Sequence, residues 1–536
     1  MGTAMNIREA KEEVIRTVKA YTARNAQGEY LIPPQKQRPL LIIGPPGIGK
    51  TAIMEQAANE CGVNLVSYTI THHTRQSAIG LPFIAHRSYG GKEMTVTEYS
   101  MSEIIASVYD QMEKSGVQEG ILFLDEINCV SETLAPTMLQ FLQYKTFGAH
   151  RLPEGFVIVT AGNPPQYNKS VRDFDIVTLD RIRRIEVTED FAVWKPYAYE
   201  SNVHGAVLAY LEIRRDHFYS IRTDVENRYF VTARGWEDLS LAMKAYEDLG
   251  LPVTELLVGE YLQDPEIARD FATYYELYRR YQEIYRIPDI LEGRESAQAL
   301  AVGGAPFDER LSLIGLLVDA LRNDCAQYAE DLAVQKTLQG VLTRLPARIK
   351  AGEAAVAALR RMTDDLEADL AAKEDAKMIA REDAHIIRAA IGELRGLERK
   401  LMVRSASPAE GAPEVAPVPG ASDAGPAGRT QELSPQADAG KAAFLQAKAW
   451  FDGREADRRA AAAVTSGHLT NAFRFMAKCF GEGQEMVIFL SELSQDSRIL
   501  QFINANGNEE YFRYNKLLLL DERRQQLTED ILRLMP

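Results

Sequence analysis

The sequence predicts an α/β fold in which a parallel sheet of five strands carries flanking helices, followed by a helical C-terminal half. Two observations lead to this prediction. Between residues 39 and 190, short apolar runs alternate with stretches of helical periodicity, which is typical of a parallel sheet. From about residue 191 onward, the pattern becomes helical and rich in aromatic residues. A chain of 536 residues is long enough for several such domains.

The strands are predicted from short apolar runs, because a run of this length bounded by polar residues fits a buried strand. We expect strands at 39–43, 64–70, 121–125, 156–161 and 183–187. An amphipathic helix is predicted before them, from about residue 5 to 24.

The remaining chain divides by composition. We expect an α/β core at 1–190, an all-helical region at 191–300, a long helical hairpin or coiled coil at 301–404, a disordered linker at 405–440 and a small helical domain at 441–536, closed by Leu517 to Leu534. Apolar residues recur every three or four positions in the hairpin region, at Val356, Leu359, Met362, Leu366 and Leu370. Pro346 and Gly352 bracket the expected bend. Six prolines among small and acidic residues leave the linker little to bury.

Composition narrows the classes of function. The net charge of −15 disfavours a broad nucleic-acid surface. The four cysteines lie far apart in the sequence without metal-ligand spacing, as expected of reduced cysteines in a cytoplasmic protein. Because the sequence contains no stretch of 18 apolar residues, we expect no membrane span.

One motif near the start of the chain predicts phosphate binding. The eight residues Gly44, Pro45, Pro46, Gly47, Ile48, Gly49, Lys50 and Thr51 fit the pattern G-x-x-x-x-G-K-[ST]. Glycines let the backbone approach an anion closely, and the following helix start attracts phosphate oxygens. Lys50 is expected to reach the β- and γ-phosphates, and Thr51 to offer its hydroxyl to Mg²⁺.

A second motif places two carboxylates at the end of the apolar strand 121–125. In a nucleotide site, Asp125 would hold Mg²⁺ through its water shell, and Glu126 would activate the attacking water. The alternative is that the two acids only cap the next helix. A phosphate loop about 75 residues earlier favours the nucleotide site.

Two further elements follow later strands. Asn163 follows the apolar run 156–161, where its side chain would reach the γ-phosphate or the lytic water; the alternative is a simple Asn163-Pro164 turn. Arg181, Arg183 and Arg184 follow Asp180, and one of them would neutralise charge on the transferring phosphoryl group. The sequence leaves open which one, and the others would favour a helix end.

Together these residues resemble the AAA+ ATPases, and within them the MoxR family, over about residues 5–285. The resemblance implies ATP and Mg²⁺, with Lys50 and Thr51 in Walker A, Asp125 and Glu126 in Walker B, and Asn163 as sensor 1. It implies that Arg181 is an arginine finger offered to the neighbouring subunit of a homo-oligomeric ring, a hexamer. It makes the region after 190 a lid, in which Arg234 is the sensor 2 residue on the γ-phosphate.

The match is less complete at Arg234, because Ala233 precedes it where relatives often have proline. The alternative is that Arg234 pairs with a carboxylate of the lid. Two inserts support the subfamily, both predicted as β-hairpins, at Pro82 to Thr97 and at Gln143 to Gly155. Their residues Phe83, Tyr89, Phe147 and His150 would either touch a client or pack locally. The pair His72-His73 is expected to be exposed rather than to bind metal, since no further ligand is evident nearby.

Three functions fit these features. The first is a MoxR-like chaperone that remodels, assembles or loads metal into a partner protein, which in this family often has a von Willebrand factor A domain. The second is a motor acting on nucleic acid, which the acidic composition disfavours. The third is a scaffold that uses nucleotide only as a switch, which the intact Glu126 disfavours.

Overall fold

The computed structural model describes residues 4–70, 80–167, 171, 174, 176–223, 228–376, 378–406 and 435–516. His72-His73, most of the predicted linker and the segment from Leu517 to Leu534 lie outside these residues. The chain forms two compact units. The first comprises Met1–Asn323, Asp375–Met378 and Gly467–Pro536, and the second comprises Asp324–Glu374 and Ile379–Ser466. The finer domain boundaries derived from the sequence stay predictions.

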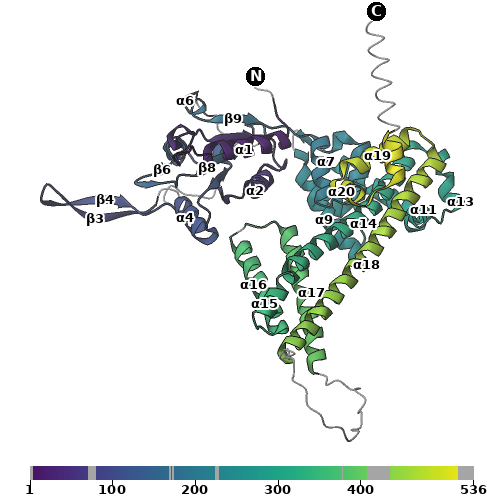
Figure 1. Ribbon diagram of the computed structural model, residues 1–536. Helices are drawn as coiled ribbons and strands as arrows, with labels where there is room; N and C mark the ends of the chain where they lie inside the picture. The colour runs from purple at the N-terminus through teal and green to yellow at the C-terminus, as the bar shows by residue number, and fades with distance from the viewer. Residues whose placement is uncertain are drawn as a thin grey trace, which may run out of the picture. The chain divides into compact units, whose positions relative to one another are not determined.

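The first unit contains the predicted five-stranded parallel sheet, with strand order β2-β5-β8-β1-β9 (Figure 1). Its strands are β1 (Leu40–Ile43), β2 (Asn64–Thr69), β5 (Gly120–Asp125), β8 (Phe156–Gly162) and β9 (Arg183–Glu186). The central strands β5 and β8 are almost wholly buried, which explains their continuous apolar sequence. The fold class predicted from the sequence is confirmed.

Helices cover both faces of this sheet. Helices α1 (Ile7–Thr22) and α2 (Lys50–Cys61) pack on one face, where Leu40, Ile121 and Phe123 point. Helices α4 (Glu103–Ser115) and α5 (Ala135–Tyr144) pack on the other, where Leu122 and Leu124 point. Because both faces are covered, the carboxyl-terminal edge of the strands is the place where polar residues reach solvent.

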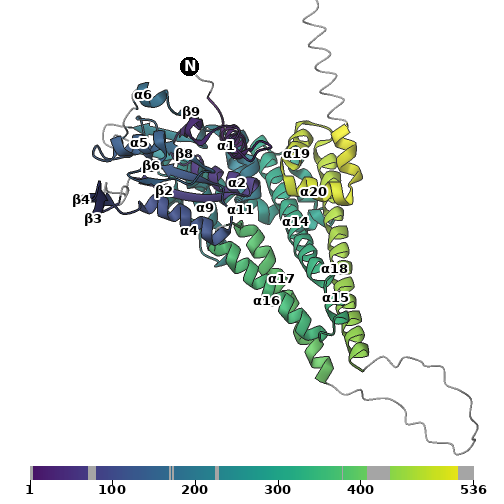
Figure 2. The same cartoon turned by 60° about the vertical axis from the view of Figure 1, so that its left-hand side comes forward.

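Both predicted insert hairpins form. The longer pairs β3 (Pro82–Tyr89) with β4 (Lys92–Tyr99); it extends away from the sheet in Figure 1 and is seen nearly end-on in Figure 2. The shorter pairs β6 (Thr146–Phe147) with β7 (His150–Arg151). The aromatic residues of the two hairpins differ: Phe83 and Tyr89 are about half exposed, whereas Phe147 is buried and stacks on Phe141 with ring centroids 4.0 Å apart. Phe147 therefore packs locally.

The region after residue 190 is helical with one exception. Its helices are α7 (Phe191–Glu200), α8 (Gly205–Ile213), α9 (Ala233–Asp248), α10 (Glu255–Tyr261), α11 (Pro265–Tyr285) and α12 (Ile287–Leu291). Side chains of Asp190, Thr232, Thr254 and Asp264 accept backbone N–H groups at four of the helix starts. The exception is a two-stranded hairpin, β10 (Ser220–Thr223) and β11 (Arg228–Val231), which the sequence analysis did not predict.

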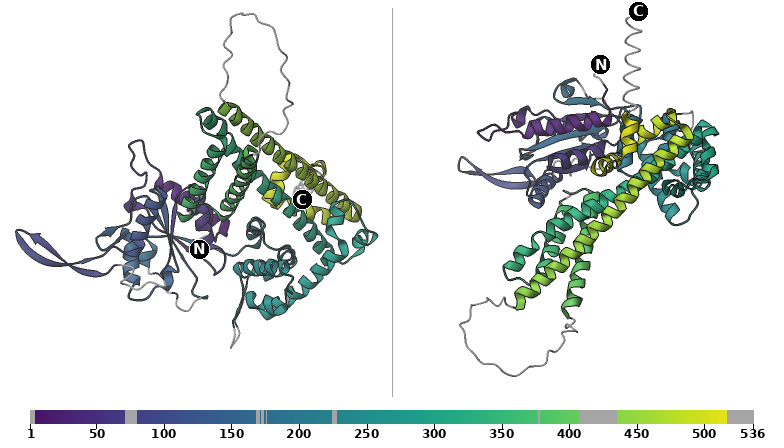
Figure 3. Two further views of the ribbon diagram at one scale, coloured as in Figure 1. Left: turned by 90° about the horizontal axis from the view of Figure 1, so that it is seen from below. Right: turned by 45° about the vertical axis from the view of Figure 1, so that its right-hand side comes forward.

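Helices make up the rest of the described chain: α13 (Ala297–Leu300), α14 (Phe307–Leu342), α15 (Leu345–Lys350), α16 (Ala355–Asp375), α17 (Arg381–Ala406), α18 (Pro435–Phe480), α19 (Gln484–Gln495), α20 (Ser497–Asn506) and a last helix at 509–516. Within the stretch 301–404, for which the sequence predicts a helical hairpin or coiled coil, α16 and α17 lie side by side (Figure 3). Leu359, Met362 and Leu370 are buried, as their spacing indicated. Within the described residues, no helix is both long and apolar enough to cross a membrane.

Candidate nucleotide site

The loop between β1 and α2 is built for close backbone approach. Gly47 and Gly49 have positive φ angles of 74° and 93°, a region that side chains other than glycine rarely adopt. A Cβ at Gly47 would lie 2.8 Å from Oγ1 of Thr232, and one at Gly44 would lie 2.9 Å from the carbonyl oxygen of Val187. The glycines are therefore required by geometry as well as by the motif.

Lys50 begins α2 and is buried, with 9% of its surface exposed. Its Nζ donates to the carbonyl oxygens of Gly44 at 2.9 Å and Pro45 at 2.7 Å, and to Oδ1 of Asn163 at 2.9 Å. Burial lowers the pKa of Lys50 to about 8, against an opposing contribution from Asp125. All three hydrogen-bond acceptors are neutral oxygens, so the positive charge has no bonded counter-ion among the described residues.

The end of β5 brings Asp125 to the start of α2. Oγ1 of Thr51 donates to Oδ2 of Asp125 at 3.3 Å, and the Glu126 N–H donates to Oδ1 of the same carboxylate at 2.9 Å. A hydroxyl and a carboxylate are the hard oxygen ligands that Mg²⁺ uses beside substrate phosphates. No group of three or more His, Cys, Asp or Glu side chains in the described parts of the chain forms a metal cage. The donor set thus fits Mg²⁺ bound jointly with phosphate.

Glu126 follows Asp125 in a left-handed conformation, with φ of 56°. Its carbonyl accepts from the N–H of Cys129 at 2.9 Å and closes the short helix η3 (Ile127–Cys129). Positive φ is uncommon for a residue with a side chain and often marks a functional turn. The turn sets the direction in which the Glu126 carboxylate leaves the strand end.

Asn163 follows β8 at the same edge of the sheet. Its side chain accepts from Lys50, and its main-chain carbonyl accepts from Nδ2 of Asn128 at 2.7 Å. The alternative interpretation as a simple turn therefore does not account for the Asn163 side chain. Asn128 had no role assigned by sequence, although it lies only two residues after Glu126.

The three arginines left open by the sequence have different partners. Arg183 pairs with Glu13 and donates to Oγ1 of Thr17 at 3.0 Å. Arg184 pairs with Glu186 at 2.6 Å. The guanidinium of Arg181 instead donates to the neutral Oε1 of Gln143 at 2.5 Å and is exposed. Within the described residues, no hydrogen bond or ion pair joins Arg181 to the phosphate loop of its own chain.

Arg234 lies in the first turn of α9, which contacts the phosphate loop directly. Its backbone N–H donates to the carbonyl of Gly47 at 3.2 Å, and its side chain is exposed. One turn further on, burial raises the pKa of the lid carboxylate Glu237, which accepts from Nε1 of Trp194 at 2.9 Å; Arg234 partly offsets that rise. The main chain of Arg234 thus contacts the phosphate loop, its side chain acts electrostatically on Glu237, and both alternative roles of Arg234 stay predictions.

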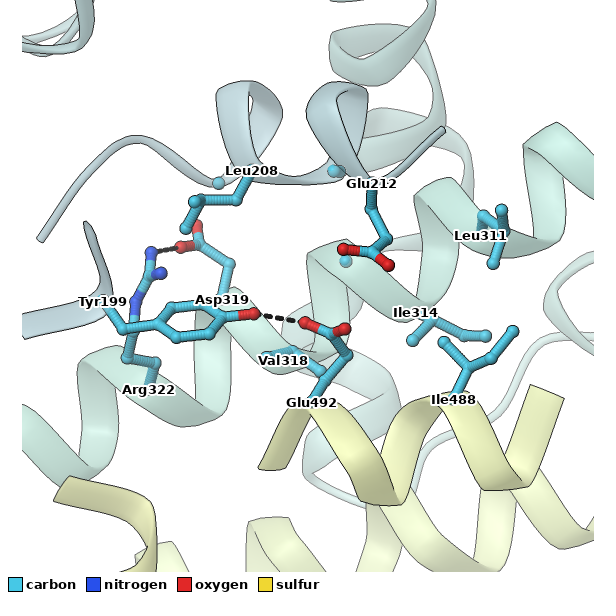
Figure 4. Close-up of a pocket in the computed structure, with 13 residues that line it drawn as sticks. Tyr199, Leu208, Glu212, Leu311, Ile314, Val318, Asp319, Arg322, Ile488 and Glu492 are labelled. Atoms are coloured by element: carbon cyan, nitrogen blue, oxygen red, sulfur yellow. Dashed lines mark hydrogen bonds and ion pairs between the residues drawn. The ribbon is translucent and has the colours of Figure 1, made fainter. Parts of the chain in front are cut away.

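A second polar cluster lies where α7 and α8 meet α14 and α19, at a cavity of about 40 Å³ (Figure 4). Nζ of Lys195 pairs with Glu212 at 2.8 Å and also with Glu492, and the Tyr199 hydroxyl donates to Glu492. Burial by itself would raise the pKa of Glu212, but Lys195 and Arg215 hold it below its usual value. The cavity has room for only a few water molecules and its charges pair with one another, which indicates a structural contact between α7, α8 and α19.

Comparison with known proteins agrees with the site at the strand ends. Residues 40–181 match the model of the AAA family, described as the ATPase family associated with various cellular activities. These residues form an AAA ATPase domain. The AAA domain spans the phosphate loop, Asp125, Glu126, Asn163 and Arg181, so the prediction of an ATPase is confirmed at the level of the domain family.

No curated protein matches the chain. Among solved structures, the chain is similar to a "putative ATPase" from Cytophaga hutchinsonii, with 12% identity, a TM-score of 0.23, and coverage of 49% of this chain and 79% of the other.

Proposed function

We propose that this protein is a MoxR-like AAA+ ATPase that hydrolyses ATP in an oligomeric ring and acts on a partner protein, which it remodels, assembles or loads with metal. The observation that carries the proposal is the convergence of Lys50, Thr51, Asp125 and Asn163. They come from three adjacent strand ends and are joined by hydrogen bonds at one edge of the sheet. Parallel α/β sheets bind ligands at this edge.

In the proposed reaction, Lys50 and the loop amides hold the β- and γ-phosphates of ATP. Thr51 and Asp125 would hold Mg²⁺, which would neutralise phosphate charge when bound. Glu126 takes a proton from a water molecule while the oxygen of that water bonds to the γ-phosphorus. The bond from the γ-phosphorus to the β,γ-bridging oxygen breaks at the same time. ADP and phosphate leave. Asn163 orients the water or the γ-phosphate.

The general base is tested with Glu126→Gln. We expect this variant to bind ATP with an affinity close to that of the unaltered protein and to lose at least about 100-fold in kcat, because the amide cannot accept the proton. Single-turnover hydrolysis and equilibrium ATP binding separate the two properties. Normal steady-state hydrolysis by Glu126→Gln would contradict the assignment.

The ring is tested through Arg181, which would serve the site of the neighbouring subunit. We expect Arg181→Ala to lose about 10³-fold or more in kcat. Mixing it with Glu126→Gln should restore activity, because some interfaces then combine an intact Glu126 with an intact Arg181. Arg184→Ala is the matched control, since Arg184 is exposed and already paired with Glu186. Mixtures as inactive as their parents at every ratio would rule out Arg181 as the finger.

The partner is identified by capture. Glu126→Gln protein with ATP should retain a client, and Lys50→Met protein, which is expected not to bind ATP, is the control. A von Willebrand factor A protein in the capture would support the chaperone role. Binding to DNA or RNA that weakens steeply with salt would instead support a nucleic-acid motor.

A further inference from the structure

Asn128 is a buried amide beside the reacting groups, with 6% of its surface exposed. Its Nδ2 donates to the main-chain carbonyl of Asn163 at 2.7 Å. Because that partner is a carbonyl, the nitrogen of the amide must face it, and the orientation of the side chain is fixed. The amide also lies against Gly162, where a Cβ would come within 2.5 Å of Oδ1 of Asn128. The amide and the strand end are therefore interlocked.

This contact joins two parts of the proposed site. Asn128 belongs to the short helix η3, whose turn begins at Glu126 and is closed by the bond from Cys129 to the Glu126 carbonyl. Asn163 in turn accepts from Lys50 through its side chain. The backbone of η3 and two hydrogen bonds thus link the Glu126 turn through Asn128 and Asn163 to the phosphate-loop lysine.

We propose that Asn128 is a positioning residue for ATP hydrolysis, which fixes the Asn163 amide relative to the Glu126 carboxylate. This inference rests on the proposed function. Water must sit between the carboxylate that takes its proton and the γ-phosphorus that it attacks. A displacement of about 1 Å in such an arrangement costs on the order of 100-fold in rate. Without the Asn128 bond, the segment after β8 loses its fixed distance to the Glu126 turn.

A second buried asparagine of the sheet makes the same kind of hydrogen bond as Asn128. It allows a positioning role of Asn128 to be distinguished from a contribution to general stability. Asn64 begins β2 and is fully buried, and its Nδ2 donates to the main-chain carbonyl of Val117, also at 2.7 Å. Residue type, burial and bond length match those of Asn128. Asn64, however, lies at the amino-terminal edge of the parallel strands, opposite the nucleotide site. Asn64→Ala is therefore a control for losing a buried amide bond without touching the site.

The experiment compares Asn128→Ala, Asn128→Ser and Asn64→Ala in the full chain, by kcat, KM, ADP affinity and thermal unfolding. We expect Asn128→Ala to lower kcat by about 100-fold while ADP affinity stays within about threefold. Asn64→Ala should lower the unfolding temperature with kcat changed less than about threefold. Asn128→Ser, which keeps a small donor, provides a folded variant of intermediate kcat if the alanine variant does not fold.

Three results would overturn the inference: an unchanged kcat in both Asn128 variants, an equal loss of kcat in Asn64→Ala, or a rise in KM without loss of kcat. These three results can be distinguished from a failure of the proposed function itself. If the unaltered protein neither binds ADP nor hydrolyses ATP, the proposed function fails. If it does both and Asn128→Ala matches it, only the role of Asn128 fails.

Discussion

Two buried lysines show how the phosphate loop differs from the lid. Lys50 donates to three neutral oxygens, and its pKa falls to about 8. Lys195 is 3% exposed and lies between the carboxylates of Glu212 and Glu492. The charge of Lys195 is thus compensated within the protein, whereas that of Lys50 is not. An anion would stabilise Lys50 and would gain nothing at Lys195.

A third lysine shows that neutral acceptors alone do not make a site. Lys145 is buried, donates to Oε1 of Gln37 at 2.9 Å, and burial lowers its pKa to about 8 as well. Lys145 directly follows α5, and its Nζ also donates to the carbonyl of Phe156, the first residue of β8. Lys145 therefore lies at the amino-terminal edge of the strands. The comparison therefore depends on position too: only Lys50 lies at the carboxyl-terminal edge of the strands.

The largest expected effect separates these two lysines. Lys50→Met should abolish nucleotide binding, because it removes the only lysine at the phosphate loop motif. Lys145→Met, with matched burial and a similar pKa, should bind ADP within about threefold of the unaltered protein. Fluorescent ADP titration measures both. If Lys145→Met lost binding as completely as Lys50→Met, burial rather than position would explain the loss.

The next effect is on stability in the lid. Lys195→Met should destabilise the protein by about 3 kcal/mol, because Glu492 would lose its lysine partner while Glu212 kept only its surface pair with Arg215. Denaturant unfolding measures the loss, and ADP affinity should change little. Adding Glu492→Gln to Lys195→Met should restore part of the stability. A Lys195→Met protein as stable as the unaltered one would contradict the interpretation of Lys195 as a structural lysine.

The nucleotide site and the contact around Lys195 also differ in how far the sequence predicts them. The five strands and the residues at their ends follow from apolar runs that stop at polar residues, so the positions of Lys50, Asp125 and Asn163 were predictable. Their catalytic roles stay predictions. The lid contact from Lys195 to Glu492 joins residues 297 positions apart, and no local pattern marks it. The short hairpin β10–β11 was missed because its strands alternate too briefly to be told from an aromatic helical stretch.

The pH dependence of nucleotide affinity tests the charge of Lys50. Because the pKa of Lys50 is about 8, its side chain loses a proton above that pH when no nucleotide is bound. Phosphate binding must then protonate Lys50 again, which costs about 1.4 kcal/mol for each pH unit above 8. ADP affinity should therefore fall by up to about tenfold per pH unit between pH 8 and 10. Without nucleotide, the free energy of unfolding should instead rise over this pH range, since the unfolded chain keeps the proton of Lys50 and the folded chain loses it. Lys145→Met should keep the trend in affinity, and a flat profile would show that Lys50 stays charged.

The smallest effect compares two buried tyrosines of the lid. Burial and Glu492 raise the pKa of Tyr199 well above its usual value, so its hydroxyl stays a donor to Glu492. Tyr199→Phe should therefore cost about 1.5 kcal/mol. The hydroxyl of Tyr278 is also buried but has no hydrogen-bond partner among the described residues. Tyr278→Phe should be neutral or stabilising, because it removes an unsatisfied polar group. Unfolding in urea distinguishes the signs, and equal losses would mean that the Glu492 bond adds nothing to the lid.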